Sequence, residues 1–92
     1  AVSTQDLTYD DFVNVYPNPA SQSLNLAIAL NIPQDVDVRI FDLTGKLVFQ
    51  DQFNEVDNSI FNIGASHLKE GVYFCVINTE KETRTEKIII AR

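Results

Sequence analysis

Residue types that commonly carry chemistry are scarce in this sequence. Cys75 is the single cysteine, which excludes an intrachain disulfide and a CxxC site. His67 is the single histidine. One histidine is too few for a histidine-rich metal site and gives little basis for a Ser-His-Asp triad. Tryptophan is absent, and no Gly-rich phosphate-binding motif occurs. The sequence therefore predicts no catalytic residue, no cofactor and no metal ligand.

Basic residues and long apolar runs are also few. Seven bases against thirteen acids give a formal net charge of -6, which argues against nucleic acid and against anionic membrane surfaces as partners. No apolar run approaches the ~18 residues of a membrane-spanning segment. No methionine is present and no signal peptide begins the chain. We therefore expect the chain to be a piece of a longer polypeptide.

The length of 92 residues suits one domain. Residues 1–11 are polar and lack periodicity, which predicts a linker from a larger upstream protein. Residues 12–92 are expected to form the domain itself. Cys75 lies in an apolar segment and is interpreted as a buried small hydrophobe, and His67 lies in a polar loop and is interpreted as surface.

Seven short segments have the apolar patterns of β-strands. Pro33 is expected to end the second of them. Residues 72–77 are apolar at successive positions, which predicts a central strand covered on both faces. Seven short strands without helical periodicity predict an all-β fold, a two-sheet antiparallel sandwich. The expected strands are residues 12–16, 24–31, 36–40, 47–53, 60–63, 72–77 and 85–91.

Asp42 and Gly45 frame a predicted tight turn between two strands. Asp at the first turn position accepts a hydrogen bond from the backbone two residues on, and Gly at the fourth position takes positive φ. Gly71 is likewise expected to let the chain turn into the central strand, and Tyr73 to bury its ring while its hydroxyl stays bonded. For each of these motifs alone, a structural role is the simpler interpretation.

The segment Pro17-Asn18-Pro19 is more unusual, because two prolines fix two φ angles and remove two donors. The segment is predicted to be a stiff bend that cannot continue a sheet ladder. Such a bend either simply ends a strand, which we favour from this motif alone, or presents a fixed shape to a receptor.

These motifs, in this order, resemble the type IX secretion (Por secretion) C-terminal sorting domain of Bacteroidetes. The resemblance rests on the stretches 15–21, 40–48, 68–74 and 87–92, so it runs over nearly the whole chain. One departure is the last hairpin, where the family often has a Gly and residues 78–83 have none. A longer loop, or Asn78 in a left-handed conformation, would replace that Gly.

The resemblance implies an immunoglobulin-like sandwich that acts as a C-terminal secretion signal and not as an enzyme. The implied partners are the outer-membrane translocon, a cell-surface sortase and the fused upstream cargo. The implied location is the periplasm in transit, then the cell surface or the medium, after cleavage in or before residues 1–11 with release or lipopolysaccharide attachment of the cargo. The candidate translocon-recognition residues are Pro17, Asn18, Pro19, Asp42, Gly45, Gly71, Tyr73 and Lys87.

Four further hypotheses stay open at this stage. The domain is alternatively a carbohydrate-binding or adhesive module, for which Phe12, Tyr16 and Phe61 are the available aromatic residues, or a structural spacer. If the last strand lies at a sheet edge, its free N–H and C=O groups are a candidate surface for a receptor strand. A calcium ion between loops is a minor alternative, because the aspartates lack EF-hand spacing.

Overall fold

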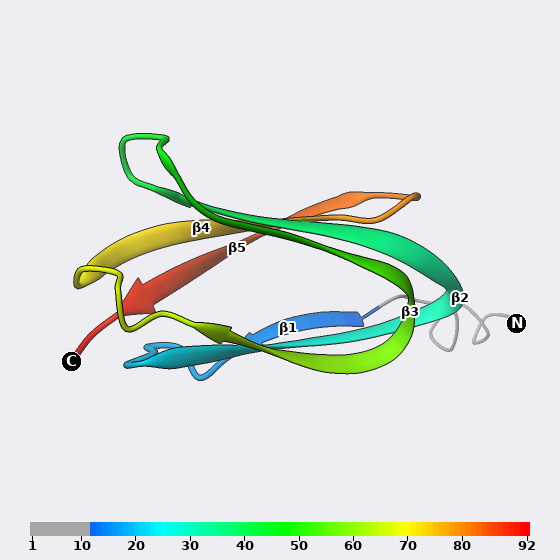
Figure 1. Ribbon diagram of the computed structural model, residues 1–92, viewed down its shortest axis with the longest axis horizontal. Coiled ribbons are helices and arrows are strands. Elements are labelled where there is room, and N and C mark those ends of the chain that lie inside the picture. Colours follow the sequence, from blue (N-terminus) through cyan, green and yellow to red (C-terminus); the bar gives the residue numbers. More distant parts are fainter. Residues whose placement is uncertain (1–11) are drawn as a thin grey trace, which may run out of the picture.

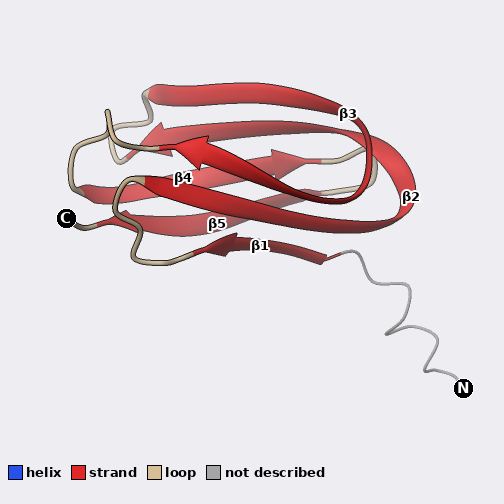
Figure 2. Ribbon diagram, turned by 60° about the horizontal axis from the view of Figure 1, so that its bottom comes forward, coloured by secondary structure: helices blue, strands red, loops and turns tan. Residues whose placement is uncertain are grey.

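The computed structural model describes residues 12–92. The predicted linker, residues 1–11, lies outside the described residues. Within residues 12–92 the chain forms strands and no helix (Figure 2), so the predicted all-β class is confirmed. All strand pairs are antiparallel. The strands are β1 (Phe12–Tyr16), β2 (Ser23–Asp42), β3 (Leu47–Gly64), β4 (Gly71–Asn78) and β5 (Thr83–Ile90).

One hydrogen-bonded sheet folds over on itself to give two layers. The strand order is β1-β2-β4-β5, with β3 paired along β2. The first part of β2 pairs with β1 and with the end of β3, whereas its last part pairs with β4 and with the start of β3. Both long strands therefore bend from one layer into the other at the same end of the molecule (Figure 1).

The structure has five strands where seven were expected, because two pairs of predicted strands are continuous. Pro33 does not end a strand but lies exposed within β2. The register with β3 shifts between Ala29 and Gln34 and again before Val36, so the missing N–H of Pro33 falls where the ladder is already irregular. Strands that change layer commonly do so through such bulges. The seven-strand, immunoglobulin-like form of the sandwich stays a prediction.

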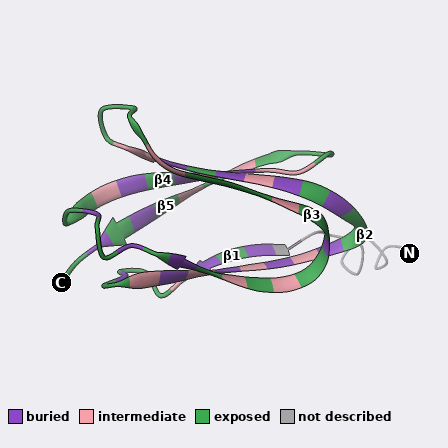
Figure 3. Ribbon diagram, viewed as in Figure 1, coloured by how far each residue is buried: buried purple, intermediate pink, exposed green. Residues whose placement is uncertain are grey.

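The core lies between the two layers and follows the predicted alternation (Figure 3). In both halves of β2 the even-numbered positions face inward, among them Leu24, Leu26, Val38 and Ile40, each fully buried. Strands β4 and β5, which lie in the same layer as the second half of β2, add Ile77, Ile88 and Ile90 to this core. One-sided burial of this kind fixes the strand register, because a shift by one residue would turn the apolar side outward.

Strand β4 lies between β2 and β5, which confirms that it is central. The prediction that both of its faces are covered is wrong. Tyr73, Cys75 and Ile77 are buried, but Phe74 on the other face is 37% exposed. Residues 72–77 thus form the middle of a sheet that packs on one side and meets solvent on the other.

The β4–β5 turn is a glycine-free loop of residues 79–82. Glu55 is the one non-glycine residue with positive φ among residues 12–92, so Asn78 is not left-handed. The Thr79 hydroxyl accepts hydrogen bonds from the backbone N–H groups of Lys81 (3.2 Å) and Glu82 (3.1 Å). Threonine side chains commonly stabilise loops in this way.

Candidate functional site

All the predicted recognition motifs lie at one end of the molecule. The loop between β1 and β2, the β2–β3 turn, the loop before β4 and the end of β5 gather where the C-terminus lies (Figures 1 and 2). We call this the motif end, residues 17–22, 42–46, 65–73 and 87–92, which includes the start of β4. The opposite bend end comprises residues 31–35, 54–57 and 79–82, where β2 and β3 change layer and β4 turns into β5.

The Asp42 turn has the predicted geometry. The N–H of Gly45 donates to the Asp42 carbonyl (3.0 Å), and Gly45 has a φ of 89°. Asp42 Oδ1 accepts hydrogen bonds from the Thr44 hydroxyl (2.6 Å), the Thr44 N–H (2.9 Å) and the Lys46 N–H (3.0 Å). The Thr44 hydroxyl bond, followed by the Lys46 N–H bond, lowers the pKa of Asp42 below its ordinary value.

The loop before β4 also has the predicted geometry. Gly71 has a φ of 151°, a conformation that residues with a Cβ rarely adopt. Two residues later, the Tyr73 ring is buried, and its hydroxyl donates to the Lys69 carbonyl (2.7 Å). A buried ring with a bonded hydroxyl fixes the loop against the sheet margin.

These two motifs meet at one pocket. Its volume is about 470 Å³, and its walls come from the β2–β3 turn on one side and the loop before β4 on the other. Ligand-binding clefts commonly have such volumes. Two of the lining residues, Asp42 and Tyr73, were predicted recognition residues. The other lining residues, which include Lys46, Leu47, His67 and Lys69, were not predicted to have this role.

The Pro17–Pro19 bend is more than the end of a strand. Strand β1 ends at Tyr16 as predicted, and both prolyl peptide bonds are cis. The Asn18 side chain then takes the place of a strand partner for β5. Its Nδ2 group donates to the Lys87 carbonyl (2.8 Å) and its Oδ1 atom accepts from the Ile89 N–H (3.0 Å). This contact joins positions about 70 residues apart in the sequence.

Ala20 continues the same contact along β5. Its N–H donates to the Ile89 carbonyl and its carbonyl accepts from the Ala91 N–H, both at 2.8 Å. Strand β5 does end the sheet order, as the edge-strand hypothesis required. Its outward groups from the Lys87 carbonyl to the Ala91 N–H are nevertheless already bonded, so that part of the edge is not free for a receptor strand.

Arg92 ties the end of the sequence to the loop before β4. Its guanidinium donates to the carbonyl oxygens of Leu68 and Ala65. The Ala65 N–H in turn donates to the Gln22 carbonyl (2.8 Å). The sequence analysis missed this role, because neither carbonyl acceptor leaves a signal in the sequence. The motif end is thus one connected unit, in which Asn18 bonds to Lys87 and the Pro17–Pro19 segment does not line the pocket.

Residues with catalytic potential are not assembled into a reactive group. Burial raises the pKa of the Cys75 thiol to about 12, and the Glu86 carboxylate adds to that rise. The thiol is therefore protonated at neutral pH and behaves as the predicted buried hydrophobe. His67 is exposed, as predicted. Within residues 12–92, no three His, Cys, Asp or Glu side chains form a group that could hold a metal ion, and no helix is suited to cross a membrane.

Comparison with known families agrees with the ordered motifs. The family model described as "Secretion system C-terminal sorting domain" matches residues 14–91. The chain belongs to this family, the type IX secretion C-terminal sorting domains. All the candidate recognition residues lie inside the matched range.

Two matched proteins are much longer than this chain. An endo-acting ulvan lyase from Formosa agariphila is 31% identical over 98 residues, covering 100% of this chain and 18% of that protein. The crystal structure of dimeric latent PorU from Porphyromonas gingivalis matches with a TM-score of 0.68 and 24% identity, over 89% of this chain and 9% of that one. The chain thus spans less than a fifth of either protein, and the second likeness shows the fold alone.

Proposed function

We propose that this sorting domain is a C-terminal secretion signal that targets an upstream cargo protein for type IX export across the outer membrane. The observation that carries the proposal is the family match over residues 14–91. The gathering of the family-like motifs at one end of the molecule supports it (Figure 1). Turns of a sandwich are the parts that present shape to a receptor.

The proposal extends to the route of the cargo. The domain passes through the periplasm, is read by the translocon, and is removed by a cell-surface sortase in or before residues 1–11. The cargo is then released or attached to lipopolysaccharide. The domain itself is a non-enzymatic, immunoglobulin-like sandwich, and its recognition residues are those of the motif end.

The carbohydrate-binding alternative has less support. Such sites commonly offer exposed aromatic rings to the sugar. Phe61, one of its three aromatic candidates, instead stacks on Phe53 with ring centroids 3.9 Å apart and packs against the core. Tyr16 is half-buried at the end of β1.

The test is an export assay. The complete chain is fused to a periplasm-directed fluorescent protein in a host with a type IX system and in a translocon-deficient strain. We expect fluorescence at the surface or in the medium only in the competent strain. Periplasmic retention in both strains, with the domain folded, would contradict the proposal and favour the carbohydrate-binding alternative.

A further inference from the structure

The pocket at the motif end is basic, although the chain as a whole is acidic. Lys46 and His67 lie on opposite walls of the pocket and Lys69 lies beside His67. Asp42 is the one acid in the lining, and its Oδ1 atom already accepts three hydrogen bonds from the turn. Neither lysine takes part in an ion pair within residues 12–92. Both ammonium groups can therefore contact an external anion, although the Asp42 carboxylate also attracts Lys46.

The rest of the lining is apolar. Leu47, which is 44% exposed, and Val48 come from the start of β3, and Leu68 and the Tyr73 ring come from the other wall. An apolar surface flanked by lysines suits a side chain and a carboxylate together. It suits inorganic phosphate less well, because phosphate alone would leave the apolar part of the lining uncovered.

The charges of the two ends differ in sign. The motif end carries four basic and two acidic side chains, a formal net charge of +2 with His67 neutral. The bend end carries one basic and five acidic side chains, a formal net charge of -4. The motif end thus attracts an acidic partner and the bend end repels it. This difference orients the domain so that the pocket faces the partner.

We propose that this pocket is the recognition site for an acidic segment of a protein of the export apparatus. An aspartate or glutamate of that segment faces Lys46 and Lys69, and a neighbouring apolar side chain packs on Leu47 and Tyr73. The positive charge of Lys46 and Lys69 in the pocket complements the negative charge of such a segment. This inference rests on the proposed function and names the surface through which that function operates.

The test compares single charge reversals in the complete chain fused to the fluorescent protein. Lys46→Glu and Lys69→Glu are each expected to lower the exported fraction about tenfold, since like charges now oppose each other across the interface. Lys81→Glu, an equal charge change at the bend end, is expected to export like the wild type. The Lys→Arg versions at positions 46 and 69 keep the charge and are expected to stay within about twofold of the wild type. Thermal unfolding of each purified domain shows that it is folded.

The outcomes separate this inference from the proposed function. Failure of the wild-type fusion to export counts against the proposed function itself. If the wild type is exported and the pocket reversals match Lys81→Glu, the pocket is not the recognition site. Equal losses of exported fraction for the Arg and Glu versions would also overturn the inference, because the positive charge at positions 46 and 69 would then not determine recognition. Binding of the wild-type domain to lipopolysaccharide vesicles that is lost in the reversals would replace the protein segment with a lipid anion.

Discussion

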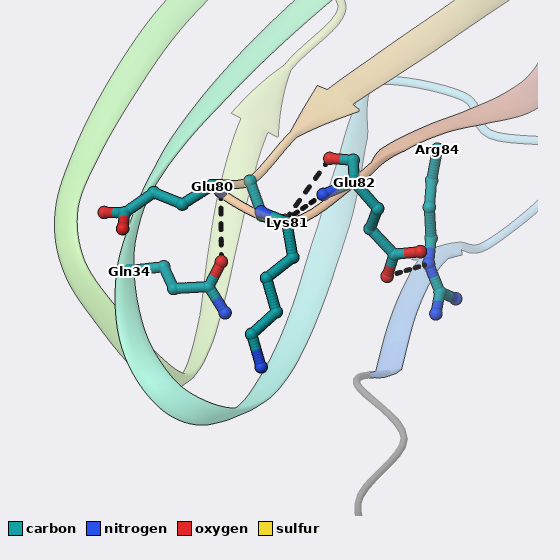
Figure 4. A network of polar contacts seen from close by, with 6 residues as sticks. Gln34, Glu80, Lys81, Glu82 and Arg84 are labelled. Atoms are coloured by element: carbon teal, nitrogen blue, oxygen red, sulfur yellow. Dashed lines mark hydrogen bonds and ion pairs between the residues drawn. The ribbon is translucent and has the colours of Figure 1, made fainter.

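The motif end and the bend end are both built from turns and bent strands, but different parts of the chain hold them together. At the bend end, Gln34 accepts from the Glu80 N–H (3.0 Å), the Glu80 carboxylate accepts from the Asp35 N–H (3.1 Å), and Arg84 pairs with Glu82 (3.1 Å), as Figure 4 shows in part. These residues are polar; Gln34 is buried, Arg84 is half-buried and the others are exposed. They join the bend of β2 to the β4–β5 turn.

At the motif end, the first and last segments of the domain hold each other. Asn18 and Ala20 bond to β5, and Arg92 bonds to the loop before β4. The turn carrying Asp42 and the loop carrying Tyr73 then form the pocket between them. The bend end is thus held by contacts between the β2 bend and the β4–β5 turn, whereas the motif end forms only when the first and last segments of the domain come together.

The largest stability effect is expected at Gly71. Gly71→Ala places a Cβ in open space but on a backbone with a φ of 151°, so we expect the free energy of unfolding to fall by about 1–3 kcal/mol. Gly64→Ala is the matched control, because Gly64 also has open space and no positive φ. It should change stability by less than about 1 kcal/mol. Urea unfolding measures the free energy of unfolding of both variants. Equal decreases would show that the positive φ of Gly71 does not determine the effect of the substitution.

A smaller effect is expected for Asn18→Ala. The substitution removes both hydrogen bonds to β5, and because the site is exposed, water replaces them in part. We expect a loss of about 1 kcal/mol, together with faster amide exchange of Ile89. Asn54→Ala at the bend end provides the control, since Asn54 is also exposed and makes no such contact with β5. Unchanged protection of the Ile89 amide would contradict the role assigned to Asn18.

The smallest effect is a pH dependence from Asp42. Its folded-state pKa is lowered from the ordinary 3.8, first by the Thr44 hydroxyl. The carboxylate therefore adds stability at pH values above 3.8, and this contribution is lost as the pH falls through the lower folded pKa. The difference in unfolding free energy between wild type and Asp42→Asn should be largest near neutral pH and shrink in acid. A difference that grows in acid would mean that Asp42 stabilises the folded state in its protonated form, contrary to this prediction.

The sequence predicted those features that are encoded locally. Asp42 with Gly45, and Gly71 with Tyr73, lie within a few residues of their partners, so turn chemistry alone was sufficient. The alternating positions of β2 were predicted because one-sided burial leaves a period of two. The prediction that Pro33 ends a strand was wrong, because a proline is tolerated within a strand where the hydrogen-bonded ladder is irregular.

The contacts that assemble the motif end were not predictable in the same way. Asn18 bonds to backbone groups of β5, and any residue supplies such groups, so no pattern marks the partner. Lys46 and Lys69 become neighbours of one pocket only because the β2–β3 turn and the loop before β4 lie at the same end. Sequence patterns reveal the elements, whereas the long-range register places them together.

We propose that the motif end, and not the stability of the domain in general, carries the export signal. The most direct measurement compares the exported fraction of Gly71→Ala with that of a bend-end variant matched to it in measured stability, such as Val56→Ala in the buried part of β3. The account predicts that export falls much further for Gly71→Ala than for the bend-end variant. Equal export by the two variants would contradict the account, because the signal would then depend on stability alone.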